Sequence, residues 1–292
     1  MKEYIAFDIG GTQIKYGIVS ETGTVRKYKT VPTEIHLGGE QIIQKLILLS
    51  KKLMNEHTIS GIGISTAGIV NIHKGVVTGG AEHIPNYATI PIIDRLQGVL
   101  QVPVSVENDV NCAALGEKWR GIGNGKRNFI MLTLGTGIGG AIFVDGELYR
   151  GHSFSAGEWG NMLIEGKPFE EVASISGLIR LVRKYKGEGG WNGKTIFELY
   201  DKGDREVTQA VEVFFKHLAI GISNLAYIFN PEMIVIGGGI TDRGNQFLKE
   251  VKEEIEKYLN KEIYSDCEIE LARNGNCAGM IGAIYHFLHW HK

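Results

Sequence analysis

Three glycine-rich segments constrain the fold of this chain most strongly, because each directly follows a run of residues that predicts a β-strand. The segments are Asp8–Thr12, Gly135–Gly140 and Gly237–Gly239. Glycine lacks a side chain, so a glycine-rich turn lets backbone N–H groups approach a phosphate closely. One such turn is common in proteins. Three of them, with Asp8 in the first and Glu107–Asp109 between the first two, indicate a nucleotide held between two halves of the protein.

The composition favours a globular protein of one or two domains. Its 292 residues are 43% hydrophobic and carry a formal net charge of −2, which gives no case for binding nucleic acid or an anionic membrane. Cys112, Cys267 and Cys277 form no CxxC motif, so we expect neither a disulfide framework nor a cysteine-rich zinc site. The N-terminus does not resemble a signal peptide, and no apolar run approaches roughly 20 residues, so we expect a cytoplasmic location.

Hydrophobic periodicity predicts the series β-β-β-α-β-α twice. In the first half we expect strands at residues 4–8, 14–19, 24–31, 62–65 and 104–106, and helices at 40–55, 91–100 and 111–119. In the second half we expect strands at 129–134, 140–144, 148–149 and 233–236, and helices at 205–229, 246–259 and 278–289. The series predicts an N-terminal domain of residues 1–115 and a larger domain of residues 116–277, with the last helix, 278–292, packing back on the first domain.

The polar segment Glu107–Asp109 follows a short apolar strand and precedes a predicted helix. Asp109 by itself is compatible with a structural role as the N-cap of that helix. Three polar groups at the carboxyl end of a strand also suit a substrate site, because open α/β sheets bind ligands at this edge. In that interpretation Asp109 accepts a proton from a substrate hydroxyl and Asn108 orients a neighbouring one.

Two glycine-punctuated loops of the second half carry acidic residues, Glu158 in the segment 157–161 and Glu170 with Glu171 in the segment 169–171. Carboxylates paired with vicinal hydroxyls commonly hold sugars, although solvated loop acids would give the same pattern. The first two glycine segments also have plain alternatives, a hairpin and a tight β-turn. The histidines near the C-terminus are interpreted as a surface tail rather than a metal site.

Taken together, these segments resemble the ROK family of sugar kinases and related repressors, within the superfamily of actin-like ATPases. The resemblance spans essentially the whole chain, and it rests on the order and spacing of the motifs. It implies an α/β fold of two actin-like (ribonuclease H-like) domains, with ATP and a sugar in the cleft between them. It also implies a homodimer.

The resemblance implies a role for each motif residue. Asp109 would be the general base, and the sugar would be bound by Gly68, Asn108, Asp109, Glu158, Asn161 and Glu170. It leaves open whether Glu170 or Glu171 makes the contact. The positions implied to bind ATP are Asp8, Gly10, Gly11, Thr12, Gly135, Thr136, Gly137, Gly139, Gly237, Gly238 and Gly239. Asp8 is also expected to orient Mg²⁺ through water, because Mg²⁺ keeps much of its hydration shell.

The chain departs from the family pattern at the zinc motif. Most members have a histidine where this chain has Asn161, followed by closely spaced cysteines, yet no cysteine lies between Cys112 and Cys267. A neutral amide is a poor zinc ligand, so we expect no structural zinc. The helix-turn-helix of the repressor branch is also missing, because the chain starts directly at the first predicted strand.

The zinc-free pattern resembles bacterial β-glucoside kinases, so the expected activity is transfer of the γ-phosphoryl of ATP to the 6-hydroxyl of a hexose or β-glucoside. N-acetylmannosamine kinase and glucokinase remain alternatives, and His83, Asn86 and Asn161 are the candidates for that choice. Other classes are a sugar-sensing regulator without a DNA-binding domain, a sugar-binding module that has lost catalysis, and a chaperone- or actin-like ATPase. The fold alone does not separate these classes.

Overall fold

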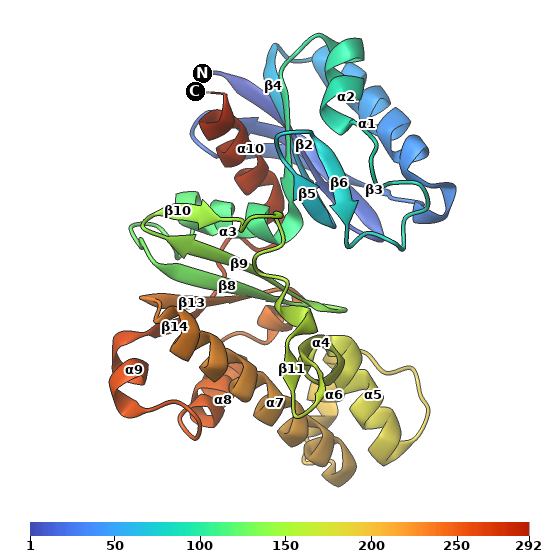
Figure 1. The fold of residues 1–292 in the computed structure, drawn as a ribbon. Helices are drawn as coiled ribbons and strands as arrows, with labels where there is room; N and C mark the ends of the chain where they lie inside the picture. The colour runs from blue at the N-terminus through green and yellow to red at the C-terminus, as the bar shows by residue number, and fades with distance from the viewer. Residues whose placement is uncertain (292) are drawn as a thin grey trace. The chain divides into compact units, whose positions relative to one another are not determined.

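The computed structural model describes residues 1–291 and divides the chain into two compact units (Figure 1). The first unit contains Met1–Gly125, Arg150–Ser155 and the segment from Arg273 onward, so both ends of the chain belong to it. The second unit contains Lys126–Tyr149 and Ala156–Ala272. Each unit is therefore built from segments that are not contiguous in the sequence.

A five-stranded sheet forms the centre of the first unit, in the order β3-β2-β1-β4-β7. Its strands are β1 (Glu3–Ile9), β2 (Gln13–Ser20), β3 (Val25–Pro32), β4 (Ile59–Thr66) and β7 (Val104–Asn108). The first three are antiparallel neighbours, whereas β4 is parallel to β1 and β7 is parallel to β4. A small hairpin follows β4, formed by β5 (Ile69–Asn71) and β6 (Val76–Gly79).

Strand β1 divides the core of the first unit into two clusters, because successive side chains of a strand point to opposite faces of its sheet. Ile5, Phe7 and Ile9 pack with buried residues of α1 (Gly39–Met54) and α2 (Ile92–Leu100). Tyr4 and Ala6 face the other way and pack with α10 (Ala278–Trp290). Helices therefore cover both faces of the sheet.

Helix α10 packs tightly against α3 (Asp109–Arg120) and β4 because glycines remove the side chains at the points of closest approach. A Cβ at Gly282 would lie 1.6 Å from the Cys112 carbonyl oxygen, and one at Gly63 would lie 2.5 Å from the Ala283 oxygen. The end of the chain is thus built into the unit that contains its beginning.

The second unit has a five-stranded sheet of the same design, in the order β10-β9-β8-β13-β14. Its strands are β8 (Phe129–Leu134), β9 (Ile138–Val144), β10 (Glu147–Tyr149), β13 (Met233–Gly237) and β14 (Glu268–Leu271). Again the first three in sequence are antiparallel neighbours, and the last two run parallel to β8. A hairpin of β11 (Leu163–Ile164) and β12 (Lys167–Pro168) lies between β10 and the helices.

Six helices belong to the second unit as far as the described chain shows. They are α4 (Phe169–Ala173), α5 (Ile175–Lys186), α6 (Gly193–Asp201), α7 (Arg205–Phe229), α8 (Asn245–Ile255) and α9 (Lys261–Asp266). Among residues 1–291, α7 is the single helix long and apolar enough to span a membrane, and 61% of its most apolar window is buried in the protein. Its buried residues, Val211, Phe214 and Leu218 among them, form the centre of this unit's core.

The predicted strands and helices are largely confirmed, with four corrections. Helix α3 begins at Asp109 rather than residue 111, and strand β9 begins at Ile138 rather than residue 140. The predicted helix 246–259 is α8, which ends at Ile255. The second half also contains elements that the simple repeat lacks, above all α4, α5, α6 and the edge strand β14. Strand β14 was missed because it is only four residues long, too short to establish a two-residue period.

Candidate active site

The turn between β1 and β2 presents backbone donors at one end of the first sheet. Gly10 N donates to Gln13 O at 3.0 Å, and Thr33 Oγ1 donates to Gly10 O at 2.6 Å, so the turn is fixed to the chain after β3. Gly11 and Thr12 are exposed, and their N–H groups have no acceptor within residues 1–291. These two donors are available to the oxygens of a phosphate.

Asp8 lies near the end of β1, where two side chains hold its carboxylate. Oδ1 accepts a hydrogen bond from Ser65 Oγ at 2.8 Å, and Oδ2 accepts one from Lys15 Nζ at 3.2 Å. A Cβ at Gly279 would lie 2.6 Å from the carboxyl carbon, so only glycine lets the first turn of α10 approach so closely. The partial positive charge of that helix end stabilises the carboxylate.

The surroundings of Asp8 suit a hydrated cation better than a fully protein-bound one. Nowhere in residues 1–291 do three His, Cys, Asp or Glu side chains gather to hold a metal ion. Mg²⁺ bound with nucleotide phosphates keeps several waters and uses one or two carboxylates. The Asp8 side chain is 17% exposed, so water reaches it. These residues therefore fit an Mg²⁺ ion that Asp8 orients through water.

Strand β7 passes into helix α3 at Asn108 and Asp109 without an intervening loop. Asn108 is the N-cap, because its Oδ1 accepts from the N–H groups of Val110 at 2.9 Å and Asn111 at 3.0 Å. Its Nδ2 donates to Gly68 O at 3.0 Å and to Asp109 Oδ1 at 2.9 Å. The N-cap role that the sequence left open for Asp109 thus belongs to Asn108, and Asp109 is the first helical residue.

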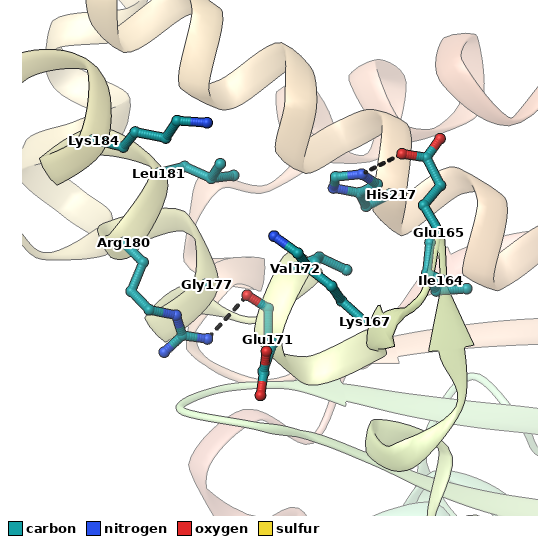
Figure 2. Close-up of a pocket in the computed structure, with 10 residues that line it drawn as sticks. All are labelled: Ile164, Glu165, Lys167, Glu171, Val172, Gly177, Arg180, Leu181, Lys184 and His217. Carbon is teal, nitrogen blue, oxygen red and sulfur yellow. Dashed lines mark hydrogen bonds and ion pairs between the residues drawn. The ribbon is translucent and has the colours of Figure 1, made fainter.

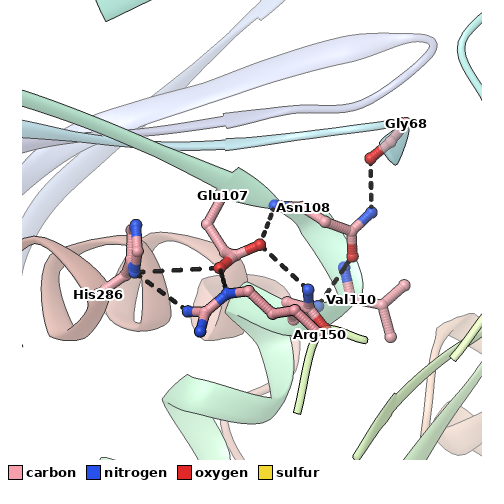
Figure 3. A network of polar contacts seen from close by, with 7 residues as sticks. Gly68, Glu107, Asn108, Val110, Arg150 and His286 are labelled. Atoms are coloured by element: carbon pink, nitrogen blue, oxygen red, sulfur yellow. Dashed lines mark hydrogen bonds and ion pairs between the residues drawn. The ribbon is translucent and has the colours of Figure 1, made fainter. Parts of the chain in front are cut away.

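A buried ion pair supports this junction from inside the first unit (Figure 3). The Glu107 side chain is only 1% exposed, and its Oε2 accepts from Arg150 Nε at 2.7 Å. Its Oε1 accepts from the N–H of Asn108 at 2.8 Å and from Asn111 Nδ2 at 3.0 Å. Every carboxylate oxygen of Glu107 is therefore occupied by a donor, which fixes the backbone immediately before Asp109.

His286 of α10 completes the same network. Its Nδ1 lies 3.5 Å from Arg150 Nη2 and 3.9 Å from Glu107 Oε2, as Figure 3 shows. Burial lowers the pKa of His286 to about 4, and Arg150 acts in the same direction while Glu107 opposes it. The imidazole is therefore neutral at neutral pH, so Glu107 and Arg150 balance each other's charge.

The turn between β8 and β9 repeats the first glycine turn within the second unit. Gly135 N donates to Gly137 O at 3.0 Å, and Gly135 O accepts from Ile175 N at 2.9 Å. Thr136 is exposed, and the N–H groups of Thr136 and Gly137 have no acceptor in the described chain. Gly139 was predicted to belong to this loop, but it lies in β9 opposite Thr133, because the strand starts at Ile138.

Glu158 and Asn161 lie at the two ends of a short 3-10 turn, and both are exposed. The turn is anchored by Trp159, which is 8% exposed and packs on Gly140 of β9. Gly157 precedes it with φ of 96°, and a Cβ there would lie 2.2 Å from the Gly140 oxygen. Glycine at both positions lets the turn sit directly on the strand that follows the second glycine turn.

The two glutamates of helix α4, Glu170 and Glu171, have different surroundings. The Glu170 Oε2 atom lies close to two glycines, because a Cβ added to Gly137 would be 2.6 Å from it and a Cβ added to Gly160 would be 2.8 Å from it. This oxygen therefore borders both the glycine turn and the 3-10 turn. Glu171 lines a different cavity, and its carbonyl accepts from Arg180 Nη2 at 2.9 Å. Of the two, Glu170 is the one that lies beside the other candidate residues of this unit.

The third glycine segment ends β13 and borders a cavity of about 570 Å³. Gly238 has φ of 95°, and a Cβ there would lie 2.2 Å from the Leu134 oxygen. A Cβ added to Gly239 would have no other atom within 4 Å, and Gly239 lines the cavity. The apolar part of the cavity wall comes from Ile175, Phe197 and Ile240.

Arg243 is the best-fixed side chain of this cavity. Its guanidinium donates to both carboxylate oxygens of Asp201 at 2.7 Å and to Glu250 Oε1 at 2.8 Å, and it lies 4.5 Å from the centre of the Phe197 ring. Bonds to the two acids raise the pKa of Arg243, although burial opposes them, so it stays charged. The arginine thereby fixes the orientation of the Phe197 ring.

Several residues that shape these sites were not predicted from the sequence. Lys15 and Thr33 hold the first turn and Asp8, while Arg150 holds Glu107. Arg243 and Phe197 shape the cavity beside Gly239. Ser65 donates a hydrogen bond to Asp8 as well. No local pattern marks these residues, because each acts on a partner distant in the sequence.

Residues 4–289 match the model of the ROK family. The chain is 38% identical over 294 residues to the β-glucoside kinase of Listeria monocytogenes, and the match covers 97% of this chain and 96% of that protein. A solved structure of an L. monocytogenes protein with a provisional assignment as an N-acetylmannosamine kinase is 36% identical to this chain, with a TM-score of 0.87. That alignment covers 99% of this chain and 100% of the other.

A further similar structure is the ROK family glucokinase of Streptomyces griseus in complex with glucose and AMPPNP. It is 28% identical with a TM-score of 0.83, and the alignment covers 96% of this chain and 97% of that one. These neighbours are sugar kinases built from two actin-like ATPase domains, which confirms the predicted fold class.

Proposed function

Because this chain belongs to the ROK family and is an ATP-dependent carbohydrate kinase, we propose that it phosphorylates the 6-hydroxyl of a hexose or a β-glucoside. The observation that supports this most is the junction of β7 and α3. There the Asn108 amide and the Asp109 carboxylate are 2.9 Å apart, held by the buried Glu107. An amide beside a carboxylate suits two neighbouring sugar hydroxyls, one to be oriented and one to be deprotonated.

Asp109 is the general base of the proposed reaction. It accepts the proton of the 6-hydroxyl while that oxygen forms a bond to the γ-phosphorus of ATP and the bond to the β-phosphate oxygen breaks, which releases ADP. Phosphoryl transfer depends mainly on positioning and on stabilising charge, so the protein's task is to orient the hydroxyl. The rigid attachment of Asp109 to the first turn of α3 serves this task.

The two glycine turns bind the phosphates of ATP in this proposal. The N–H groups of Gly11 and Thr12 in one unit, and of Thr136 and Gly137 in the other, have no acceptor in the described chain and suit phosphate oxygens. Gly10 and Gly135 shape these turns through their own hydrogen bonds. Mg²⁺, oriented by Asp8 through water, would neutralise part of the phosphate charge when bound.

The cavity beside Gly239 is the proposed adenosine site. Its volume of about 570 Å³ lies within the usual range of small-molecule pockets. The Phe197 ring, fixed by Arg243, offers a flat apolar wall to a purine base. Gly239, which follows Gly237 and Gly238 at the end of β13, lines this cavity, so a side chain at this position would take up part of its volume.

The remaining hydroxyls of the sugar are assigned to exposed side chains of the second unit and to Asn108. Glu158 and Asn161 lie on one short turn, and Glu170 lies against Gly160 of that same turn. Gly68 contributes indirectly, because its carbonyl holds the Asn108 amide at 3.0 Å. Glu170 is preferred over Glu171, since the latter faces a separate cavity.

The test of the proposed base is Asp109→Asn. We expect turnover to fall by roughly 10²–10⁴-fold while the melting temperature stays close to that of the wild type, because the amide keeps the size of the side chain. Asp94→Asn, an exposed acid in the first turn of α2 in the same unit, serves as the matched control. Unchanged turnover of the Asp109 variant would remove Asp109 from the mechanism.

The sugar itself is tested with a panel of glucose, mannose, N-acetylmannosamine, N-acetylglucosamine, cellobiose and gentiobiose. Preferred turnover of the β-linked disaccharides supports a β-glucoside kinase, as in the Listeria relative. Turnover confined to N-acetylmannosamine or to glucose assigns the chain to one of the alternatives, which other similar proteins represent. Absence of turnover with every sugar of the panel would favour a sugar-sensing regulator. If the preferred sugar is not a β-glucoside, His83 and Asn86 are the first residues to substitute.

Four accompanying properties are part of the proposal. The kinase works in the cytoplasm, it forms a homodimer, it binds no DNA, and it carries no structural zinc because Asn161 replaces a histidine ligand. Light scattering, a gel-shift assay and metal analysis of the purified protein test the last three properties in turn. One tightly bound zinc per chain would refute the interpretation of Asn161.

A further inference from the structure

A second cavity of the second unit is lined by Glu171 and Val172 of α4 but not by Glu170, and the proposed reaction does not use it (Figure 2). Its volume is about 370 Å³, which is enough for a small metabolite. Helices α4, α5 and α7 and the β11–β12 hairpin supply its walls. Ile164, Val172 and Leu181 form an apolar floor, and Lys167, Arg180 and Lys184 are its cations.

The cations of this cavity are unpaired, unlike their neighbours on α5. Arg183 pairs with Glu188 at 3.2 Å, and Lys186 pairs with Asp204 at 2.7 Å. By contrast, Lys167, Arg180 and Lys184 make no ion pair with any carboxylate of residues 1–291. Arg180 and Lys184 are one helical turn apart, so both project from the same face of α5. Three uncompensated positive charges therefore gather around one space.

The two acids of the cavity do not neutralise these cations. Glu165 Oε1 is bound by Lys216 Nζ at 2.6 Å, and its Oε2 lies 3.3 Å from His217 Nε2. Hydrogen bonds from Lys216 and His217 lower the pKa of Glu165, so it remains an ionised and occupied partner. Figure 2 shows the Glu171 carboxylate pointing away from Lys184 and His217. The space between the lysines thus keeps a positive character.

His217 adds a polar group to the cavity wall. Its side chain is 12% exposed, and its Nδ1 is buried without a hydrogen-bond partner among the described residues. When Nε2–H donates to Glu165, Nδ1 is an acceptor that lacks a donor. A hydroxyl group is a fitting donor for it, whereas a bare anion is not. The wall therefore combines cations with a site for a hydroxyl.

We propose that this cavity binds a phosphorylated sugar as a regulatory ligand. Lys167, Arg180 and Lys184 bind the phosphate, and His217 Nδ1 accepts a hydrogen bond from a hydroxyl of the sugar. Charge-assisted hydrogen bonds to phosphate are the strong ones, so the cations supply most of the affinity. The apolar floor packs against the carbon face of the ring.

Helix α4 connects this ligand to the candidate active site. The helix is five residues long, with Glu170 bordering Gly137 and Gly160 while Glu171 and Val172 line the regulatory cavity. Arg180 also bonds the Glu171 carbonyl at 2.9 Å, so a ligand that draws Arg180 toward its phosphate acts on α4 directly. This coupling rests on the proposed role of Glu170 in sugar binding, whereas the binding itself does not.

The experiment is calorimetric titration of the full chain, without nucleotide, with glucose 6-phosphate, ribose 5-phosphate and inorganic phosphate. The test variant is Lys167→Gln/Lys184→Gln. The matched control is Lys202→Gln/Lys249→Gln, which removes the same charge from exposed positions of the same unit. Asp109→Asn and Glu170→Gln report binding at the candidate active site instead.

We expect a sugar phosphate to bind the wild type, the control and both active-site variants with affinities within about twofold. The test variant should bind at least about a hundredfold more weakly, because two charged hydrogen bonds are lost. Preference for glucose 6-phosphate over ribose 5-phosphate would identify the ligand as product-like, and the reverse preference would identify it as a different sugar phosphate.

Three results would overturn the inference. Equal binding by Lys167→Gln/Lys184→Gln and the wild type would place the ligand elsewhere, and loss of binding in Asp109→Asn or Glu170→Gln would place it in the active site. Binding of inorganic phosphate as tight as that of either ester would remove the sugar from the proposal. These results do not depend on turnover, so they are separate from a failure of the proposed kinase mechanism.

In turnover assays, the bound ester should change the KM for the sugar acceptor in the wild type and the control but not in Lys167→Gln/Lys184→Gln. An identical response of all three proteins would refute the coupling through α4. The response must also vanish in Glu170→Gln if that glutamate carries the signal, and its persistence there would assign the signal to another residue.

Discussion

The two five-stranded sheets have the same order and the same strand directions, yet they carry different chemistry at their ends. In both, the turn between the first two strands exposes a threonine and leaves two consecutive N–H groups without an acceptor in the described chain, at Gly11 and Thr12 and at Thr136 and Gly137. The repeated frame thus produces the same anion-binding turn twice. A turn of this kind follows from local geometry alone.

The sheets differ where their fifth strands end. In the first unit β7 leads directly into Asn108 and Asp109, supported by the buried ion pair of Glu107 and Arg150. In the second unit β14 ends at Leu271 and is followed by Ala272–Asn276, a segment that carries no carboxylate. The fold supplies equivalent positions, and the side chains placed there differ between the two units.

Among the variants that test this comparison, Glu107→Gln should have the largest effect on the free energy of unfolding, because it breaks the buried ion pair of the first unit. We expect a loss of about 3 kcal/mol in the free energy of unfolding, because Arg150 keeps its charge without a partner. Urea denaturation measures this loss in the free energy of unfolding. The double variant Glu107→Gln/Arg150→Met should recover part of the loss. A stability within about 0.5 kcal/mol of the wild type would show that the pair does not support the junction.

The next effect concerns pH and also belongs to the first unit. The pKa of His286 is lowered from its ordinary value of 6.5 to about 4 in the folded protein, so between these values the unfolded chain binds a proton that the folded chain does not. Stability is therefore lost as pH falls through this window, by about 2 kcal/mol between pH 7 and pH 5. The variant His286→Leu should lose less over the same range. Equal pH profiles of the two proteins would exclude His286 as the cause.

The third effect tests the glycine segment of the second unit with a matched pair. Gly238→Ala should cost roughly 1–3 kcal/mol, because residue 238 has positive φ and its Cβ would meet the Leu134 carbonyl. Gly239→Ala has open space and should leave the melting temperature nearly unchanged while raising the KM for ATP. Equal melting temperatures for the two variants would mean that the segment accommodates a side chain at either position.

The smallest expected effect on stability is at Glu170, the exposed counterpart of buried Glu107. Glu170→Gln should leave the free energy of unfolding within about 0.5 kcal/mol of the wild type and raise the KM for the sugar by roughly tenfold. Glu171→Gln, its neighbour on α4, is the control and should leave that KM unchanged. If Glu171→Gln has the larger effect, the assignment of the two glutamates must be exchanged.

Much of the frame could be predicted from the sequence because its signals are local. The two-residue period of β1 to β3 and the helical spacing of Ile42, Ile43 and Leu46 in α1 depend on neighbours a few positions apart. Two of the elements that were missed are too short to show a period. The strand β14 has four residues, and α4 has five, so neither is long enough to show a period.

The sequence by itself determined the glycine turns, the strands before them and the polar segment at Asn108 and Asp109, since each is set by residues next to one another in the chain. Only the tertiary structure decided which of two adjacent polar residues caps α3, because the N-cap depends on where β7 ends. It also decided the partners of Glu107, which are 43 and 179 residues away at Arg150 and His286. Contacts between residues so distant in sequence arise only when packing of the sheet and helices brings them together, and no local pattern encodes that packing.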